Sequence, residues 1–223
     1  MPTLRSGTVP DLLAAVQAAN PSRPRLTWYG PAGERIELSA RTLANWVNKA
    51  ANLLVEELDV EPGALVAIVR PWHWKTLVVA AAALSAGAEV RLVESAQQVV
   101  DADLLVSTSA DQPAGAGGWL LVEPAALARS YTATLPSGAV DFAAEVTGQD
   151  DVFIATAPLA LGPVTALTPQ ARVLLRTDDG DALHVLLAAL AADGSVVLAV
   201  PETAQLDLAG EAAHPVDELT VPA

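Results

Sequence analysis

A short apolar segment that runs into a small-residue loop is the first place where this sequence could do chemistry. Residues 152–155 (VFIA) have strand character, and the loop 156–163 (TAPLALGP) follows directly. A strand that enters a loop of small residues is a common phosphate cradle, because the backbone N–H groups can approach the oxygens. Here only Thr156 offers a hydroxyl, only one glycine is present, no lysine follows, and two prolines lack an N–H. The loop is therefore not expected to hold a triphosphate in the usual way.

A second candidate is the stretch 70–75 (RPWHWK), which follows an apolar segment at 64–69 (ALVAIV). That segment is apolar on both faces, as a central strand of a covered parallel sheet must be. Ligands of open α/β sheets gather at the carboxyl ends of strands, so this stretch could bind an apolar or anionic group. The alternative is that the two tryptophans pack under the next helix while His73 and Lys75 are solvated. The candidate ligand-binding residues are Arg70, Trp72, His73, Trp74, Lys75 and Thr156.

Other polar residues fit ordinary structural roles better. The stretch ALSAG around Ser85 is similar to a nucleophile elbow, but that elbow joins a strand to a helix, whereas Ser85 lies near a helix end. His184 has apolar neighbours on a predicted helix and is expected to pack there. His214, Asp217 and Glu218 could touch a divalent ion, but their spacing matches no recognised site. We predict no catalytic residue and no metal site.

Composition narrows the class of partner. The chain has 223 residues, 52% of them hydrophobic, a formal net charge of −14 and no cysteine. Such an acidic surface repels nucleic acid and anionic lipid, and it disfavours free ATP unless magnesium or a local basic patch intervenes. The N-terminus lacks the apolar core of a signal peptide, and the longest apolar stretch, Thr76–Ala88, is too short to span a bilayer. We expect a soluble, cytoplasmic protein.

The elements that must position the candidate residues follow from periodicity and caps. Helices are predicted to begin at Thr8, Ser39, Pro71 and Asp181, and the third is predicted to end at Gly87. Strands alternate with these helices, which predicts an α/β fold with mostly parallel sheets and helices on both faces. The predicted strands lie at 25–30, 34–39, 64–69, 89–94, 103–108, 119–123, 152–155, 172–177 and 195–200.

The chain is predicted to form two α/β lobes. The segment 82–94 resembles 188–202, because each is a helix end, a glycine and a strand. Unrelated segments in which a strand follows a helix can show the same pattern. The predicted parts are a first lobe at 1–129, an irregular connection at 130–149, a smaller lobe at 150–200 and an acidic tail at 201–223.

The region 37–93 also resembles a known family. Its pattern of a polar helix start, a long helix, an apolar strand, a proline turn and a helix closing in Ala-Gly-Ala is similar to the N-terminal region of the adenylate-forming superfamily. That superfamily includes acyl-CoA synthetases, luciferases and nonribosomal peptide adenylation domains, and a small actinobacterial family related to AMP-binding enzymes is also similar. The residues that carry the likeness are Leu38, Ser39, Gly63, Val66, Ala67, Pro71, Ala86, Gly87 and Ala88.

The resemblance implies a fold but not an activity. In catalytic members the loop that corresponds to residues 156–163 is rich in Thr, Ser and Gly and ends in Pro-Lys. Later motifs of those members supply a ribose-binding aspartate and a catalytic lysine. The sequence ends before those motifs, so none of the catalytic residues can be carried over and Mg-ATP is not expected to bind in the usual way. We expect a non-catalytic, degenerate relative that acts as a binding or regulatory protein, with a protein partner or as a homodimer. The alternatives are a partner-dependent enzyme fragment with residual nucleotide or acyl binding, and a structural, self-associating protein.

Overall fold

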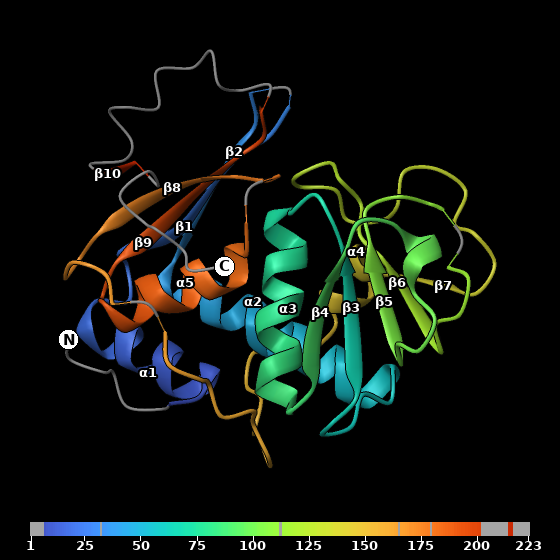
Figure 1. Cartoon of the computed structure of the whole chain (residues 1–223), viewed down its shortest axis with the longest axis horizontal. Helices are drawn as coiled ribbons and strands as arrows, with labels where there is room; N and C mark the ends of the chain where they lie inside the picture. The colour runs from blue at the N-terminus through green and yellow to red at the C-terminus, as the bar shows by residue number, and fades with distance from the viewer. Residues whose placement is uncertain are drawn as a thin grey trace. The chain divides into compact units, whose positions relative to one another are not determined.

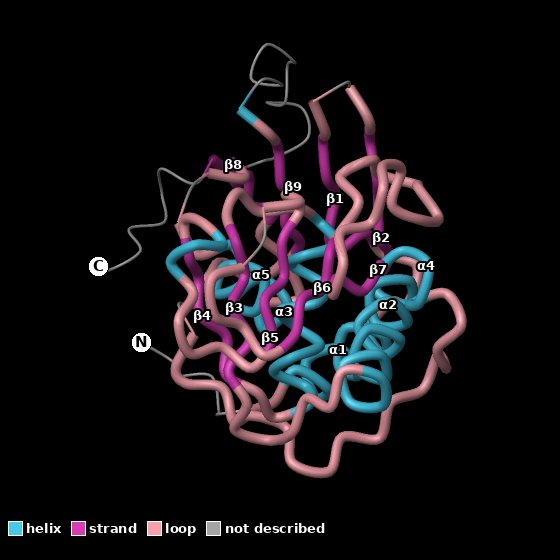
Figure 2. Tube along the Cα trace, turned by 90° about the vertical axis from the view of Figure 1, so that its right-hand side faces the viewer, coloured by secondary structure: helices cyan, strands magenta, loops and turns pink. Residues whose placement is uncertain are grey.

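The computed structural model describes residues 7–201 except 32, 112, 165 and 179, together with the backbone of 214 and 215. The chain divides into two compact units, and each contains one five-stranded sheet (Figure 1, Figure 2). Unit 1 comprises Met1–Ala44 and Ala160–Ala223, and unit 2 comprises Asn45–Leu159. Most strand pairs are parallel, which confirms the predicted α/β fold with mostly parallel sheets.

The described elements of unit 1 are α1 (Val9–Ala19), β1 (Pro24–Tyr29), β2 (Arg35–Ser39), β8 (Arg172–Arg176), α5 (Ala182–Ala191), β9 (Ser195–Ala199) and β10 (His214–Pro215). Its sheet has the order β10-β8-β9-β1-β2. All neighbours in it are parallel except β1 and β2, which form the predicted antiparallel hairpin. Helix α5 packs on β8, β9 and α1, so a parallel β8-α5-β9 unit forms the centre of unit 1.

The described elements of unit 2 are η1 (Leu53–Glu57), a short π-helical turn, β3 (Leu65–Val69), α3 (Trp74–Ala86), β4 (Glu89–Val93), η2 (Ala96–Gln98), β5 (Leu104–Ser107), β6 (Gly118–Leu121), β7 (Ala139–Asp141) and α4 (Phe142–Val146). All of its strand pairs are parallel, in the order β4-β3-β5-β6-β7. Helix α2 (Ala40–Asn52) contains the boundary between the units.

Three helices begin at the predicted residues, and a side chain caps the start of each. Thr8 and Asp11 form a capping box at α1, Ser39 accepts a backbone hydrogen bond from the first turn of α2, and Asp181 does the same for α5. The side-chain oxygen satisfies an N–H group that has no partner within the helix. These starts are confirmed because they depend on residues only three positions apart.

Helix α3 begins later than predicted. Its N-cap is His73, whose backbone is extended and whose imidazole accepts the Lys75 N–H, so Pro71 and Trp72 lie outside the helix. The predicted end at Gly87 is confirmed, because this residue adopts φ = 90° and closes the helix in a left-handed conformation. Every residue of α3 is buried, and the helix packs against β3 and β4.

The predicted strand at 152–155 does not form. Val152 is 68% exposed and Ile154 is 81% exposed, and neither belongs to a sheet. The last place beside β6 is taken instead by β7, which lies in the segment 130–149 that was predicted to be irregular. Strand propensity without a neighbouring strand does not make a strand, because the stabilisation comes from cross-strand pairing.

The division into units also differs from the predicted lobes. Residues 8–44 group with the C-terminal part of the chain, because β1 pairs in parallel with β9, with Leu26 opposite Val196. That pairing joins segments about 170 residues apart, so no local pattern reports it. Of the predicted tail at 201–223, only Pro201 and the backbone of 214–215 are described, and the side chains of His214, Asp217 and Glu218 lie outside the described residues.

The described helices include none that combines the length and the apolar character needed to cross a bilayer.

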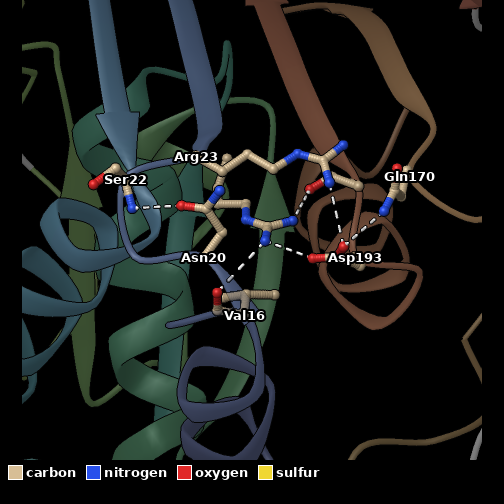
Figure 3. Close-up of polar contacts among 8 residues, drawn as sticks. Val16, Asn20, Ser22, Arg23, Gln170 and Asp193 are labelled. Carbon is tan, nitrogen blue, oxygen red and sulfur yellow. Dashed lines mark hydrogen bonds and ion pairs between the residues drawn. The ribbon is translucent and has the colours of Figure 1, made fainter. Parts of the chain in front are cut away.

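The buried side chain of Arg25 connects three elements of unit 1, and Figure 3 labels its partners Val16 and Asp193. The Arg25 side chain is fully buried and donates to the Asp193 carboxylate at 2.5 Å and to the Gly194 carbonyl at 3.0 Å. Arg23 and Gln170 also bind Asp193, which stands at the α5–β9 turn with φ = 55°. Burial alone would raise the pKa of the Asp193 carboxyl, but the hydrogen bond from Arg25 and the arginine charges lower it below its ordinary value of 3.8.

Asp193→Asn should lower the free energy of unfolding by about 1–3 kcal/mol, because it leaves the Arg25 guanidinium buried without a carboxylate. Asparagine tolerates the left-handed backbone, so the substitution isolates the charge. The folded-state pKa of Asp193 is lowered, so its contribution is present above about pH 4 and is lost below it. Urea unfolding should show a difference in the free energy of unfolding between wild type and variant that is constant above pH 5 and becomes smaller below pH 4. A gap that does not change with pH would contradict the ion pair.

Candidate functional site

The predicted residues 70–75 lie at the carboxyl edge of the unit 2 sheet, between β3 and α3. Strand β3 has β4 on one side and β5 on the other, so the strand order reverses there. This is the position at which open parallel sheets usually bind ligands. The side chains of this segment therefore decide whether the edge is available to a ligand.

Lys75 is buried and uses its ammonium group inside unit 2. The side chain is 1% exposed, and Nζ donates to the carbonyl oxygens of Glu123 and Ala125, both at 2.9 Å. The Glu123 carboxylate accepts from the Ala125 N–H and from both the N–H and the hydroxyl of Thr132. Burial alone would raise the pKa of Glu123, but these hydrogen bonds and the Lys75 charge lower it. The ammonium thus holds the loop after β6 onto the start of α3.

His73 is neutral at physiological pH. Its imidazole Nδ1 accepts the Lys75 backbone N–H at 3.2 Å, and the His73 backbone N–H donates to the Thr76 hydroxyl at 3.0 Å. Burial, and then the nearby Lys75 charge, lower the pKa of His73 to about 3, against weaker opposing effects of the Pro124 carbonyl and Glu123. A histidine that does not titrate near pH 7 is a poor general acid or base, so its role here is to cap α3.

The two tryptophans pack in the core, as the structural alternative expects. Trp72 and Trp74 are each 2% exposed, and Trp46 lies edge-on to Trp74 with ring centroids 5.2 Å apart. His73 and Lys75 are also buried, which corrects the expectation that they are solvated. Arg70 forms an ion pair with Glu94 at 3.1 Å.

Thr156 does not join the other predicted residues. Its neighbour Ala157 packs against Gly87, so closely that a Cβ on Gly87 would lie 2.3 Å from the Ala157 carbonyl oxygen. Leu159 donates its N–H to the Leu84 carbonyl at 2.9 Å. These contacts place Thr156 at the C-terminal end of α3, whereas His73 caps the N-terminal end, and 13 helical residues span about 20 Å. The six predicted residues therefore form no single site.

Half of the backbone positions in the loop 156–163 are closed to a phosphate. The N–H groups of Leu159 and Leu161 donate to the Leu84 and Gly7 carbonyls, each within its own unit. Pro158 and Pro163 have no N–H. Four of the eight positions are thus closed to an anion.

Three residues that sequence reasoning missed hold the segment before this loop. Asn48 donates to the Asp151 carbonyl at 2.8 Å, and Asn52 donates to the Asp150 and Val152 carbonyls at 2.9 and 3.0 Å. Lys49 pairs with the Asp151 carboxylate at 3.1 Å and donates to the Gln149 carbonyl. The available signal was a pair of asparagines four positions apart in a helix, where asparagine is otherwise unfavourable.

The described side chains include no group of three or more His, Asp or Glu residues that could hold a metal ion. Ser85 donates its hydroxyl to the Ala81 carbonyl within α3, so it is not arranged as a nucleophile.

No family model matches the chain. A TIGR03089 family protein from Mycobacterium tuberculosis is 38% identical over 162 residues, which cover 69% of this chain and 63% of the relative. The match thus spans less than two thirds of that relative.

Solved structures of low sequence identity share the fold. The N-terminal domain of FACL13 from Mycobacterium tuberculosis aligns with a TM-score of 0.61 at 11% identity, over 86% of this chain and 57% of that chain. The N-terminal subdomain of NpsA from Klebsiella oxytoca aligns with a TM-score of 0.62 at 14% identity, over 89% and 55%. Acetoacetyl-CoA synthetase from Streptomyces lividans aligns with a TM-score of 0.64 at 12% identity, over 87% and 38%. The fold is that of the N-terminal domain of adenylate-forming enzymes, and the predicted resemblance is confirmed.

His73→Asn should make unfolding less dependent on pH. The folded-state pKa of His73, about 3, lies below its ordinary 6.5, so the unfolded chain binds the proton first. The contribution of neutral His73 to the free energy of unfolding should therefore be present above pH 6.5 and be lost as the pH decreases, by up to about 1.4 kcal/mol per pH unit between pH 6 and 5. Asparagine caps helices well and does not titrate, so urea unfolding of the variant should lack this slope. Equal slopes in the two proteins would contradict a buried neutral histidine.

Proposed function

We propose that this protein is a non-catalytic relative of adenylate-forming enzymes that works by binding another protein. The single observation that carries the proposal is the loop 156–163, in which two N–H groups are bonded inside the protein and two positions are proline. A phosphate cradle works by aiming backbone N–H groups and positive charge at the oxygens. This donor set does not fit ATP.

The residues at the other end of α3 support the same proposal. Lys75 lies in the first turn of α3, and its ammonium donates to two backbone carbonyls of the same unit. Releasing it to bind a phosphate would leave those carbonyls and the Glu123 carboxylate buried without their cation, which is costly. His73 stays neutral at pH 7 and caps the helix. We therefore assign Lys75 no role in neutralising a phosphate and His73 no role in proton transfer.

Calorimetric titration of the purified chain tests the proposal. With Mg-ATP and then with AMP, we expect no heat of binding, that is, a Kd weaker than about 1 mM. Pyrophosphate exchange with a panel of carboxylic acids should stay at the level of the blank.

Thr156→Ala and Thr147→Ala form a matched pair for this test, because both threonines are exposed and only the first lies in the loop. Neither change should alter the titration. A Kd below about 100 μM in the wild type that Thr156→Ala weakens and Thr147→Ala does not would overturn the proposal. It would favour a partner-dependent enzyme fragment instead.

A further inference from the structure

The segment 152–157 of unit 2 presents an unpaired backbone next to exposed apolar side chains. The N–H groups from Val152 to Ala157 donate to no acceptor in the described part of the chain. Val152 and Ile154 are 68% and 81% exposed, while Phe153 between them is half-buried. In an extended chain alternate N–H groups point to opposite sides, so about three donors of this segment, which bends at Thr156 and Ala157, face any one neighbouring chain.

The two ends of this segment are anchored, so its backbone is held in place. At one end, Asn52 is 6% exposed and binds the carbonyls of Asp150 and Val152. At the other end, Ala157 packs against Gly87, whose φ of 90° and close approach require glycine. A strand receptor that is already positioned loses less entropy on binding than a free loop does.

Acidic residues lie at both ends of the segment. Asp150 and Asp151 precede it, with the Asp151 carboxylate paired to Lys49 at 3.1 Å, and Glu61 is adjacent to Pro62, which contacts Gly87 beside Ala157. Glu61 and Asp150 are exposed, and the chain carries a net charge of −14. A second copy in antiparallel pairing would bring like charges together at both ends, whereas a basic strand would be attracted.

We propose that residues 152–157 bind an extended basic segment of a partner protein by strand addition, with alternate apolar side chains of the partner contacting Val152 and Ile154. Main-chain hydrogen bonds supply affinity in this mode, and the alternating side chains and flanking charges supply selectivity. The inference rests on the proposed binding function and names the chemistry of its partner.

A labelled heptapeptide that alternates lysine with valine is the probe, used with the full chain at 150 mM salt. Its twin carries N-methyl groups on the valines, which keeps the charge and removes backbone donors. Fluorescence anisotropy should show the first peptide binding at least about tenfold more tightly than the twin. Hydrogen exchange of the amides at 152–157 should slow when the first peptide is added. Equal binding of both peptides, or unchanged exchange at these amides, would overturn the proposal.

Ile154→Lys and Leu127→Lys are a matched pair of variants. Both side chains are about 80% exposed and apolar, both belong to unit 2, and both changes add one positive charge. We expect Ile154→Lys to weaken peptide binding at least about tenfold and Leu127→Lys to change it less than about twofold. Equal losses would mean that only net charge attracts the peptide, which overturns the assigned surface.

Sedimentation of the wild type and of Ile154→Lys tests whether a second copy of the chain covers the segment instead. A wild-type dimer that Ile154→Lys converts to a monomer would show that a second copy covers the segment, and this would overturn the basic partner. Titration with Mg-ATP on the same preparation keeps the two proposals apart. Peptide binding together with ATP binding would overturn only the non-catalytic function, whereas neither kind of binding would overturn only the docking segment.

Discussion

The complete burial of helix α3 is the constraint on which the rest of unit 2 depends. A buried helix cannot leave its terminal N–H and C=O groups to water, so the protein must satisfy them itself. At the N-terminal end this is done by His73 and the Thr76 hydroxyl, and at the C-terminal end by Gly87 and the N–H of Leu159. The segments on both sides of the helix are therefore positioned by the needs of its ends.

This constraint also explains where the candidate ligand-binding residues lie. Lys75 lies one position inside the buried helix, so its ammonium must find acceptors within the unit, and the carbonyls of Glu123 and Ala125 provide them. The start of the loop 156–163 packs against the opposite end of the same helix. Both the Lys75 ammonium and the Leu159 N–H are thus bonded inside unit 2.

Unit 1 meets a similar demand with a different cation. Arg25 is fully buried in β1 and binds the Gly194 carbonyl and the Asp193 carboxylate at the turn between α5 and β9. In each unit one buried cation binds at least one backbone carbonyl in the segment that follows a helix or a strand. Because a buried charge without partners is very costly, each cation also specifies which segment must pack beside it.

The sequence by itself determined the elements whose signals are local. The caps at Thr8, Ser39 and Asp181 and the end of α3 at Gly87 depend on residues a few positions apart, and short-range hydrogen bonds and sterics decide them. Only the tertiary structure decided that β1 pairs with β9, that β7 rather than 152–155 completes the second sheet, and that Lys75 is buried. Those outcomes depend on which distant segment takes the neighbouring place, and strand propensity or side-chain charge carries no information about that neighbour.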